Sequence, residues 1–175
     1  MTTREKTLIG RTSYAKFPAE RVRVPAKIDT GADSSSVWAS ELHVDDDFEL
    51  SFVLFGKESP FYTGTRHTTK NYKARQVRSS NGTTQIRYQV QLTVVLGGRK
   101  VRGSFTLADR SSNTYPVLIG CRLLTGKFLV DVARGKKKRD AEKPYSESLN
   151  KELQDNPKAF FEKYHQTNQR GDITL

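Results

Sequence analysis

Asp29-Thr30-Gly31 is the part of this chain whose residue types most clearly suit chemistry. The carboxyl group can hold or accept a proton, the neighbouring hydroxyl can support the carboxylate, and the glycine lets backbone amides approach it. The apolar residues before it predict a strand that delivers the carboxylate into a tight turn. The same tripeptide is also typical of an Asx-turn, in which the aspartate bonds its own backbone. The tripeptide alone therefore leaves a catalytic and a structural interpretation open.

A second block, residues 116–125, lies about ninety residues downstream and supplies context for the tripeptide. Leu118 and Ile119 precede Gly120, and the residues that follow predict a short helix. In this order and at this distance the two blocks resemble the retropepsins, the retroviral-type aspartic proteases. The resemblance implies that the Leu118-Ile119-Gly120 segment passes beside the strand that ends at Asp29 and gives the turn structural support.

A more specific resemblance is to a bacterial group of retropepsin-like proteins that carries the label ATP-dependent zinc protease. It extends over residues 7–133, and its blocks are Leu8–Arg11, Lys27–Ala32, Val77–Gly82 and Gly126–Asp131. The resemblance implies an all-β, closed retropepsin-like barrel in which Asp29, Thr30 and Gly31 form the catalytic turn. Ala32 and Asp33 are then expected to contact substrate.

One position departs from the retropepsin pattern. The family places an arginine directly after the glycine of the second block, where this chain has Cys121, with Arg122 one residue later. The family arginine pairs with the second aspartate of the turn, which is Asp33 here. Either Arg122 reaches Asp33 by a different path or this support is absent, and a buried Asp33 without a cation would be costly or protonated. We interpret Cys121 as a small buried apolar side chain rather than a nucleophile.

The elements that must position these residues are short strands. Apolar runs separated by glycines, prolines and polar turns favour an all-β barrel or sandwich over a helical bundle. The clearest strand signal is the alternation of apolar and polar residues from Ile86 to Val94, which predicts a strand whose apolar face, Ile86 included, is buried. Further strands are expected at residues 7–17, 21–29, 37–39, 49–55, 72–79 and 101–107.

Two glycine-containing pairs predict hairpins. Gly97-Gly98 suits a two-residue turn between the alternating strand and its successor. Asn81-Gly82 stands between two further strand signals, and in retropepsins a hairpin at this point in the order of elements covers the substrate as a flap. The resemblance therefore implies that Ser80, Asn81 and Gly82 contact substrate, while an ordinary surface turn is the alternative.

The composition changes after the barrel. With 175 residues and 35% hydrophobic content the chain has room for one modest core, so we predict a barrel domain at residues 1–133. Residues 134–175 are charged and polar and predict a basic, partly helical extension. Ser146 can cap a helix containing Leu149 and Leu153, and Asn156-Pro157 suits the start of another that carries three aromatic residues.

The formal net charge of +11 makes nucleic acid, an acidic lipid surface or an acidic polypeptide a plausible partner. We prefer an acidic polypeptide substrate. The densest basic run, residues 134–139, is interpreted as a solvated hinge, which makes nucleic acid the less favoured partner. No segment has the length and hydrophobicity of a membrane span or the apolar core of an export signal, so we expect a cytoplasmic protein without membrane contact.

The sequence does not support the metal and nucleotide in the group's label. His43, His67 and His165 are widely separated and lack the spacing of a catalytic zinc site. There is also no glycine-rich loop with a Lys-Ser/Thr ending. We therefore expect neither a metal nor another cofactor. The resemblance implies an association with ATP-grasp ligases that add glutamate to proteins, which would supply the nucleotide chemistry.

Hydrolysis by aspartic peptidases requires two carboxylates that share one proton. The chain contains one Asp-Thr-Gly and no second Asp-Thr/Ser-Gly. An active peptidase must therefore be a homodimer in which Asp29 meets its copy on the two-fold axis. The alternatives are a non-catalytic peptide-binding module that keeps the turn for its architecture, and, less favoured, a nucleic-acid-binding protein that uses residues 136–139.

Overall fold

The computed structural model describes residues 5–78, 84–135 and 143–164. The chain divides into two compact units, Met1–Gly135 and Lys136–Leu175. The first unit contains all the strands of the described residues. They are β1 (Thr7–Gly10), β2 (Thr12–Phe17), β3 (Val22–Asp29), β4 (Ser35–Val44), β5 (Leu50–Leu54), β6 (Arg66–Thr69), β7 (Tyr72–Arg78), β8 (Thr84–Leu96), β9 (Arg99–Ala108), β10 (Val117–Gly120) and β11 (Phe128–Asp131).

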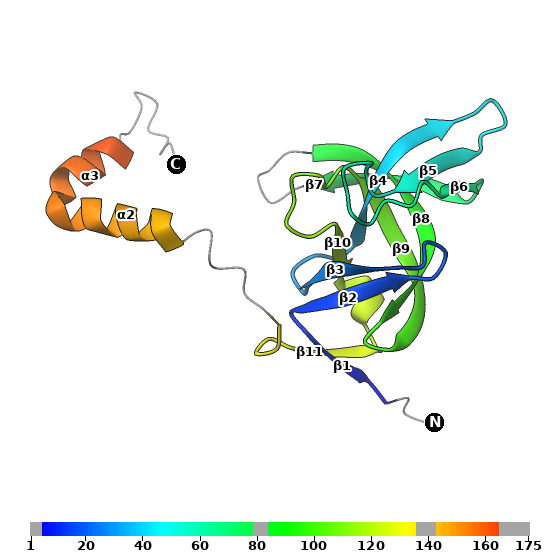
Figure 1. Ribbon diagram of the computed structural model, residues 1–175, viewed down its shortest axis with the longest axis horizontal. Coiled ribbons are helices and arrows are strands. Elements are labelled where there is room, and N and C mark those ends of the chain that lie inside the picture. The colour runs from blue at the N-terminus through cyan, green and yellow to red at the C-terminus, as the bar shows by residue number, and fades with distance from the viewer. Residues whose placement is uncertain (1–4, 79–83, 136–142, 165–175) are drawn as a thin grey trace. The chain divides into compact units, whose positions relative to one another are not determined.

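Six of these strands form a closed barrel, which confirms the predicted fold class. The order is β10-β3-β2-β8-β9-β4, and β10 also pairs with β4, which closes the ring (Figure 1). β3 and β10 run parallel, with Ile28 opposite Ile119 and Asp29 opposite Gly120. The second sequence block therefore lies directly beside the strand that ends at Asp29.

The barrel core is filled by the inward-facing residues of these strands. Val24, Ala26 and Ile28 alternate with more exposed residues along β3 and are buried. Phe17 packs against Phe55 and Phe105, with ring centroids 5.9 Å and 6.3 Å apart. Because β3 is fixed by this burial along its length, the position of Asp29 at its end is fixed as well.

Two predicted strands differ from the structure. The segment 7–17 is broken at Arg11, because β1 leaves the barrel and pairs in parallel with β11. Ile86, predicted to be buried, is 72% exposed. Within the part of the chain that the structure describes, this part of β8 pairs with β7 alone, whereas β9 pairs with β8 from Gln89 onward. A two-stranded ribbon that extends beyond the barrel has no core against its faces. Ile86 therefore continues the apolar alternation of β8 but is exposed to solvent.

Three helices lie in the described residues: α1 (Cys121–Leu124), α2 (Lys143–Asp155) and α3 (Pro157–Tyr164). α1 follows β10 as predicted. Asn156 caps α3, since its side-chain oxygen accepts a hydrogen bond from the Ala159 amide at 3.0 Å. The prediction that Ser146 caps the preceding helix is wrong, because α2 begins three residues earlier. None of these helices has the length and hydrophobicity needed to cross a bilayer.

Candidate active site

Asp29 ends β3 with a carboxylate that remains 24% exposed. Its Oδ1 accepts a hydrogen bond from the Gly31 amide at 3.1 Å, and its Oδ2 lies 3.2 Å from the Lys27 ammonium. In the single chain these contacts support the carboxylate, whereas we had expected the Thr30 hydroxyl in that role. The difference arises because the turn brings the Gly31 amide under Oδ1, and the strand period puts Lys27 on the same face as Asp29.

The outer surface of the turn faces solvent. Thr30 and Gly31 are both exposed. A Cβ placed on Gly31 would meet only Asp29 Oδ1, at 3.5 Å, which is an ordinary van der Waals distance. The fold of the single chain therefore does not require a glycine at this position.

At Gly120, in contrast, the fold of the single chain does require a glycine, because the turn packs against this residue. A Cβ at Gly120 would lie 2.6 Å from the carbonyl carbon and oxygen of Ser34 and 2.7 Å from the Ala32 oxygen. The Gly120 amide donates to Ser35 Oγ at 3.1 Å. β10 thus lies so close to the turn that only a glycine fits between them.

The first residues of α1 hold the turn from the other side. The Cys121 amide donates to the Ala32 carbonyl at 2.7 Å, and the Arg122 amide donates to the Asp33 carbonyl at 3.1 Å. The Cys121 thiol donates to the Thr30 carbonyl at 2.9 Å. Cys121 is half-buried and makes this polar contact, so the interpretation as a small buried apolar side chain is wrong. Its thiol occupies a polar position beside the turn.

Asp33 and Arg122 resolve the question raised by the missing arginine. The Arg122 Nη2 lies 3.6 Å from Asp33 Oδ2, with the two side chains 67% and 84% exposed. An exposed pair at this distance contributes little to stability. The turn is therefore held by the backbone hydrogen bonds from α1, and Asp33 needs no buried cation.

A further cation, Arg110, interacts with the Asp29 carboxylate. Burial lowers the pKa of Arg110, the Arg87 guanidinium lowers it further, and the Asp29 carboxylate partly offsets both effects. Arg110 is half-buried and donates to the Tyr115 carbonyl at 3.1 Å. An arginine remains protonated in proteins. Positive charge therefore approaches Asp29 from Lys27 on β3 and from Arg110 in the segment between β9 and β10.

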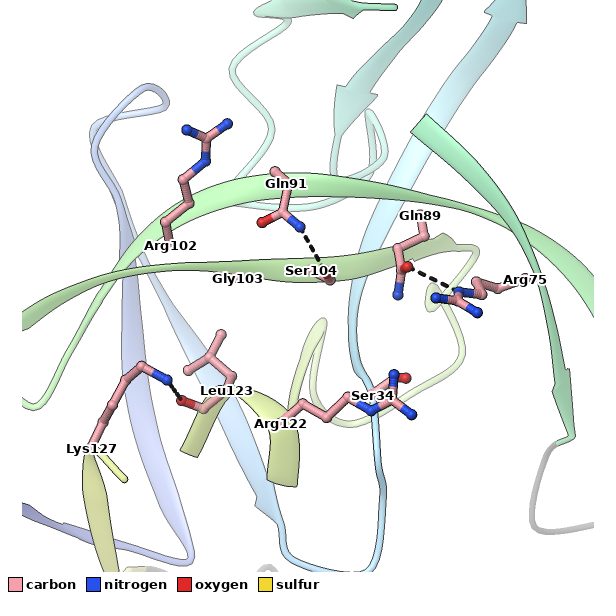
Figure 2. Close-up of a pocket in the computed structure, with 10 residues that line it drawn as sticks. All are labelled: Ser34, Arg75, Gln89, Gln91, Arg102, Gly103, Ser104, Arg122, Leu123 and Lys127. Atoms are coloured by element: carbon pink, nitrogen blue, oxygen red, sulfur yellow. Dashed lines mark hydrogen bonds between the residues drawn. The ribbon is translucent and has the colours of Figure 1, made fainter. Parts of the chain in front are cut away.

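A cavity of about 290 Å³ lies between α1 and the strands β7, β8 and β9 (Figure 2). Its lining includes four cationic residues, Arg75, Arg102, Arg122 and Lys127, together with the amides of Gln89 and Gln91. Figure 2 shows Arg75 hydrogen-bonded to Gln89, at 3.0 Å, and Arg122 extending beside Ser34. The described residues that line this cavity include no carboxylate.

The structure brings together most of the site residues predicted from the sequence: Asp29, Thr30, Gly31, Ala32, Asp33, Leu118, Ile119, Gly120 and Arg122. Ser80, Asn81 and Gly82 lie outside the described residues, although β7 and β8, which flank them, are paired from Tyr72 to Arg78. Three cations near the turn or in the cavity lining, Arg75, Arg110 and Lys127, were not predicted from the sequence. The net charge of +11 was the one sequence signal that pointed toward them.

A closed barrel with one Asp-Thr-Gly turn packed against a hydrophobic-hydrophobic-Gly strand defines the retropepsin-like class of proteins. Within that class, this chain belongs to the RimB-like family, described as retropepsin-like aspartic endopeptidase RimB, whose family model matches residues 8–140.

The curated relatives are longer proteins. The chain is 31% identical over 130 residues to a probable alpha-L-glutamate ligase of Shewanella pealeana, and 26% identical over 130 residues to one of Parasynechococcus marenigrum. Each match covers 72% of this chain but only 28% of the relative. Among solved structures, a Legionella pneumophila protein of unknown function is similar with a TM-score of 0.54 and 21% identity, over 74% of this chain and 96% of that one. This last likeness supports the fold alone.

Proposed function

We propose that the protein is an aspartic-type peptidase in which Asp29 from two subunits forms the catalytic dyad. The observation that carries the proposal is the exposed turn, where one supported carboxylate sits beside a glycine that its own chain does not need. A second subunit that approaches along a two-fold axis would account for that glycine, because two turns can meet closely only where no side chains intervene.

In the proposed reaction, one carboxylate of the dyad accepts a proton from a water molecule, whose oxygen attacks the carbon of the peptide carbonyl. The other carboxyl group donates a hydrogen bond to the carbonyl oxygen as charge develops there. The tetrahedral intermediate then releases the amine, which takes up a proton, and leaves a new carboxyl group. The Lys27 side chain is 52% exposed and can move from Asp29 when the second carboxylate approaches.

The charges around the site favour an acidic polypeptide as substrate. Lys27 and Arg110 lie near Asp29, and the adjoining cavity is lined by four further cations. Such a surface attracts acidic chains and repels basic ones. The relatives named as glutamate ligases support a glutamate-containing substrate, and we propose that the protein acts on the products of such a ligase.

One observation favours a different function. The Lys27–Asp29 ion pair neutralises the carboxylate within the single chain, as a purely structural turn would. A non-catalytic peptide-binding module with this fold would remain a monomer and bind peptides without cleaving them. The peptidase requires two subunits to associate, whereas the peptide-binding module does not. A substitution at Gly31 tests this difference.

Gly31→Ala is expected to leave the unfolding of the separate subunit unchanged but to lower peptide hydrolysis by about a hundredfold. The new methyl group fits its own chain, whereas it would displace a second turn by roughly 1 Å from the productive arrangement. Sedimentation and hydrolysis of an acidic peptide should be measured over the same dilution series. Activity of the wild-type protein in a strictly monomeric state, or full activity of Gly31→Ala, would contradict the proposal.

A further inference from the structure

The cavity beside α1 combines strong positive charge with fixed hydrogen-bond donors. Arg75 and Gln89 lie on one side of it, on β7 and β8, and Arg122 and Lys127 lie on the other, on and just after α1 (Figure 2). Gln89 is 8% exposed, and its side-chain oxygen is already bonded to Arg75 Nε at 3.0 Å. That bond leaves the amide NH₂ of this nearly buried side chain as a donor at the cavity wall.

The cavity is connected to the Asp29 turn by both of its walls. On the α1 side, Arg122 bonds to Asp33 through its backbone amide and approaches it through its guanidinium, and Ser34 lines the cavity. On the sheet side, Gln89 lies two residues along β8 from Arg87, whose charge acts on Arg110 near Asp29. Alternate residues of a strand are about 7 Å apart. A peptide extended across Asp29 would therefore reach the cavity within a few residues.

A carboxylate side chain suits this cavity better than an apolar or basic one. Arginine presents paired N–H donors that match a carboxylate, and charge-assisted hydrogen bonds are stronger than neutral ones. An apolar group would leave the Arg and Gln donors without partners, and a lysine would meet four like charges. About 290 Å³ accommodates a side chain of the size of glutamate with some bound water.

We propose that this cavity is a specificity-determining subsite that binds an acidic side chain of the substrate, a few residues from the bond that is cut. The inference rests on the proposed peptidase function, and it assigns Arg75, Gln89 and Arg122 the recognition of that side chain. Recognition at a distance from the cleaved bond requires a substrate peptide that is long enough to extend from Asp29 to the cavity. The preferred substrate is therefore an acidic segment of several residues rather than a dipeptide.

Binding can be measured without cleavage on the full chain carrying Asp29→Asn. A fluorescent glutamate-rich peptide and a matched peptide with glutamine in place of glutamate serve as probes. Arg75→Gln and Arg122→Gln should each weaken binding of the glutamate peptide about tenfold and leave the weak binding of the glutamine peptide unchanged. Arg75→Lys should recover part of the affinity because it restores the charge without the paired donors. Lys16→Gln is the matched control, since Lys16 is exposed on β2 and lies outside the cavity lining.

The outcomes separate this inference from the proposed function. Equal losses of affinity for the glutamate peptide in Lys16→Gln and Arg75→Gln would show that net charge alone attracts the peptide, and would overturn the subsite. Displacement of the peptide by an equal concentration of inorganic phosphate would also overturn it, because the cavity would then be a site for small anions. Cavity-dependent binding, together with no cleavage of the glutamate peptide by the protein that retains Asp29, would support the subsite and refute the peptidase. Cleavage that is indifferent to Arg75 and Arg122 would do the reverse.

Discussion

Asp29→Asn is expected to reduce peptide hydrolysis by at least about a thousandfold while the barrel remains folded. Asparagine keeps an oxygen that can accept the hydrogen bond from the Gly31 amide, so the turn retains its main support. It cannot accept the proton that the attacking water must lose. The ion pair with Lys27 is also lost, but the Lys27 side chain is half exposed and such pairs add little to stability.

The measurement is the initial rate of cleavage of a library of peptides at acidic to neutral pH, with the free energy of unfolding determined in parallel. Asp47→Asn is a suitable control because Asp47 is exposed in the connection between β4 and β5, where neither the site nor the cavity contacts it. It removes the same charge and should cleave as the wild type does. Residual hydrolysis in Asp29→Asn above about a tenth of the wild-type rate would exclude the proposed chemistry.

Gly120→Ala is expected to destabilise the barrel by about 3 kcal/mol and to abolish activity. The added methyl group would lie 2.6 Å from backbone atoms of Ser34 and 2.7 Å from the Ala32 oxygen. Backbone atoms cannot rotate away as a side chain can, so either β10 or the turn must shift. A shift of the turn moves Asp29, because the two strands are paired at that position.

Urea denaturation of dilute protein, in which the subunits are separate, measures this effect. Gly31→Ala is the matched control, since it adds the same methyl group to the same turn, four residues before Ser35, which Gly120 contacts. There the new methyl group would lie 3.5 Å from Asp29 Oδ1, an ordinary contact distance. The two substitutions should thus separate fold from function: Gly120→Ala destabilises the subunit, and Gly31→Ala leaves its stability unchanged while it lowers activity. Unchanged stability of Gly120→Ala would show that the close packing of β10 on the turn is not what holds Asp29 in place.

The strands that position Asp29 could be predicted from the sequence because their signals are local. The alternation along residues 22–28 gives β3 one buried face, and Gly97-Gly98 marks a tight hairpin in which both glycines have positive φ. The resemblance placed Gly120 beside Asp29, and the register of β3 with β10 agrees. Each of these features depends on residues that are near in sequence or on one recognised motif.

Features assembled from distant segments could not be predicted. The buried carboxylate of Glu20 bonds with His67 and Thr63, which are more than forty residues away, and no local pattern links them. The cavity likewise joins β7, β8, β9 and α1, so its charge becomes visible only when the strands are paired. Ile86 was misplaced because the period of a strand does not reveal whether a core lies beneath it.

The most direct test of the shared dyad is the activity of mixtures of wild-type and Asp29→Asn subunits, at constant total concentration well above that needed for association. If each active site requires Asp29 from both subunits, random exchange leaves about a quarter of the dimers fully wild type in an equal mixture. We predict residual activity of about a quarter, falling with the square of the wild-type fraction. Activity that falls in direct proportion to that fraction, to about one half in the equal mixture, would contradict a dyad formed from two chains.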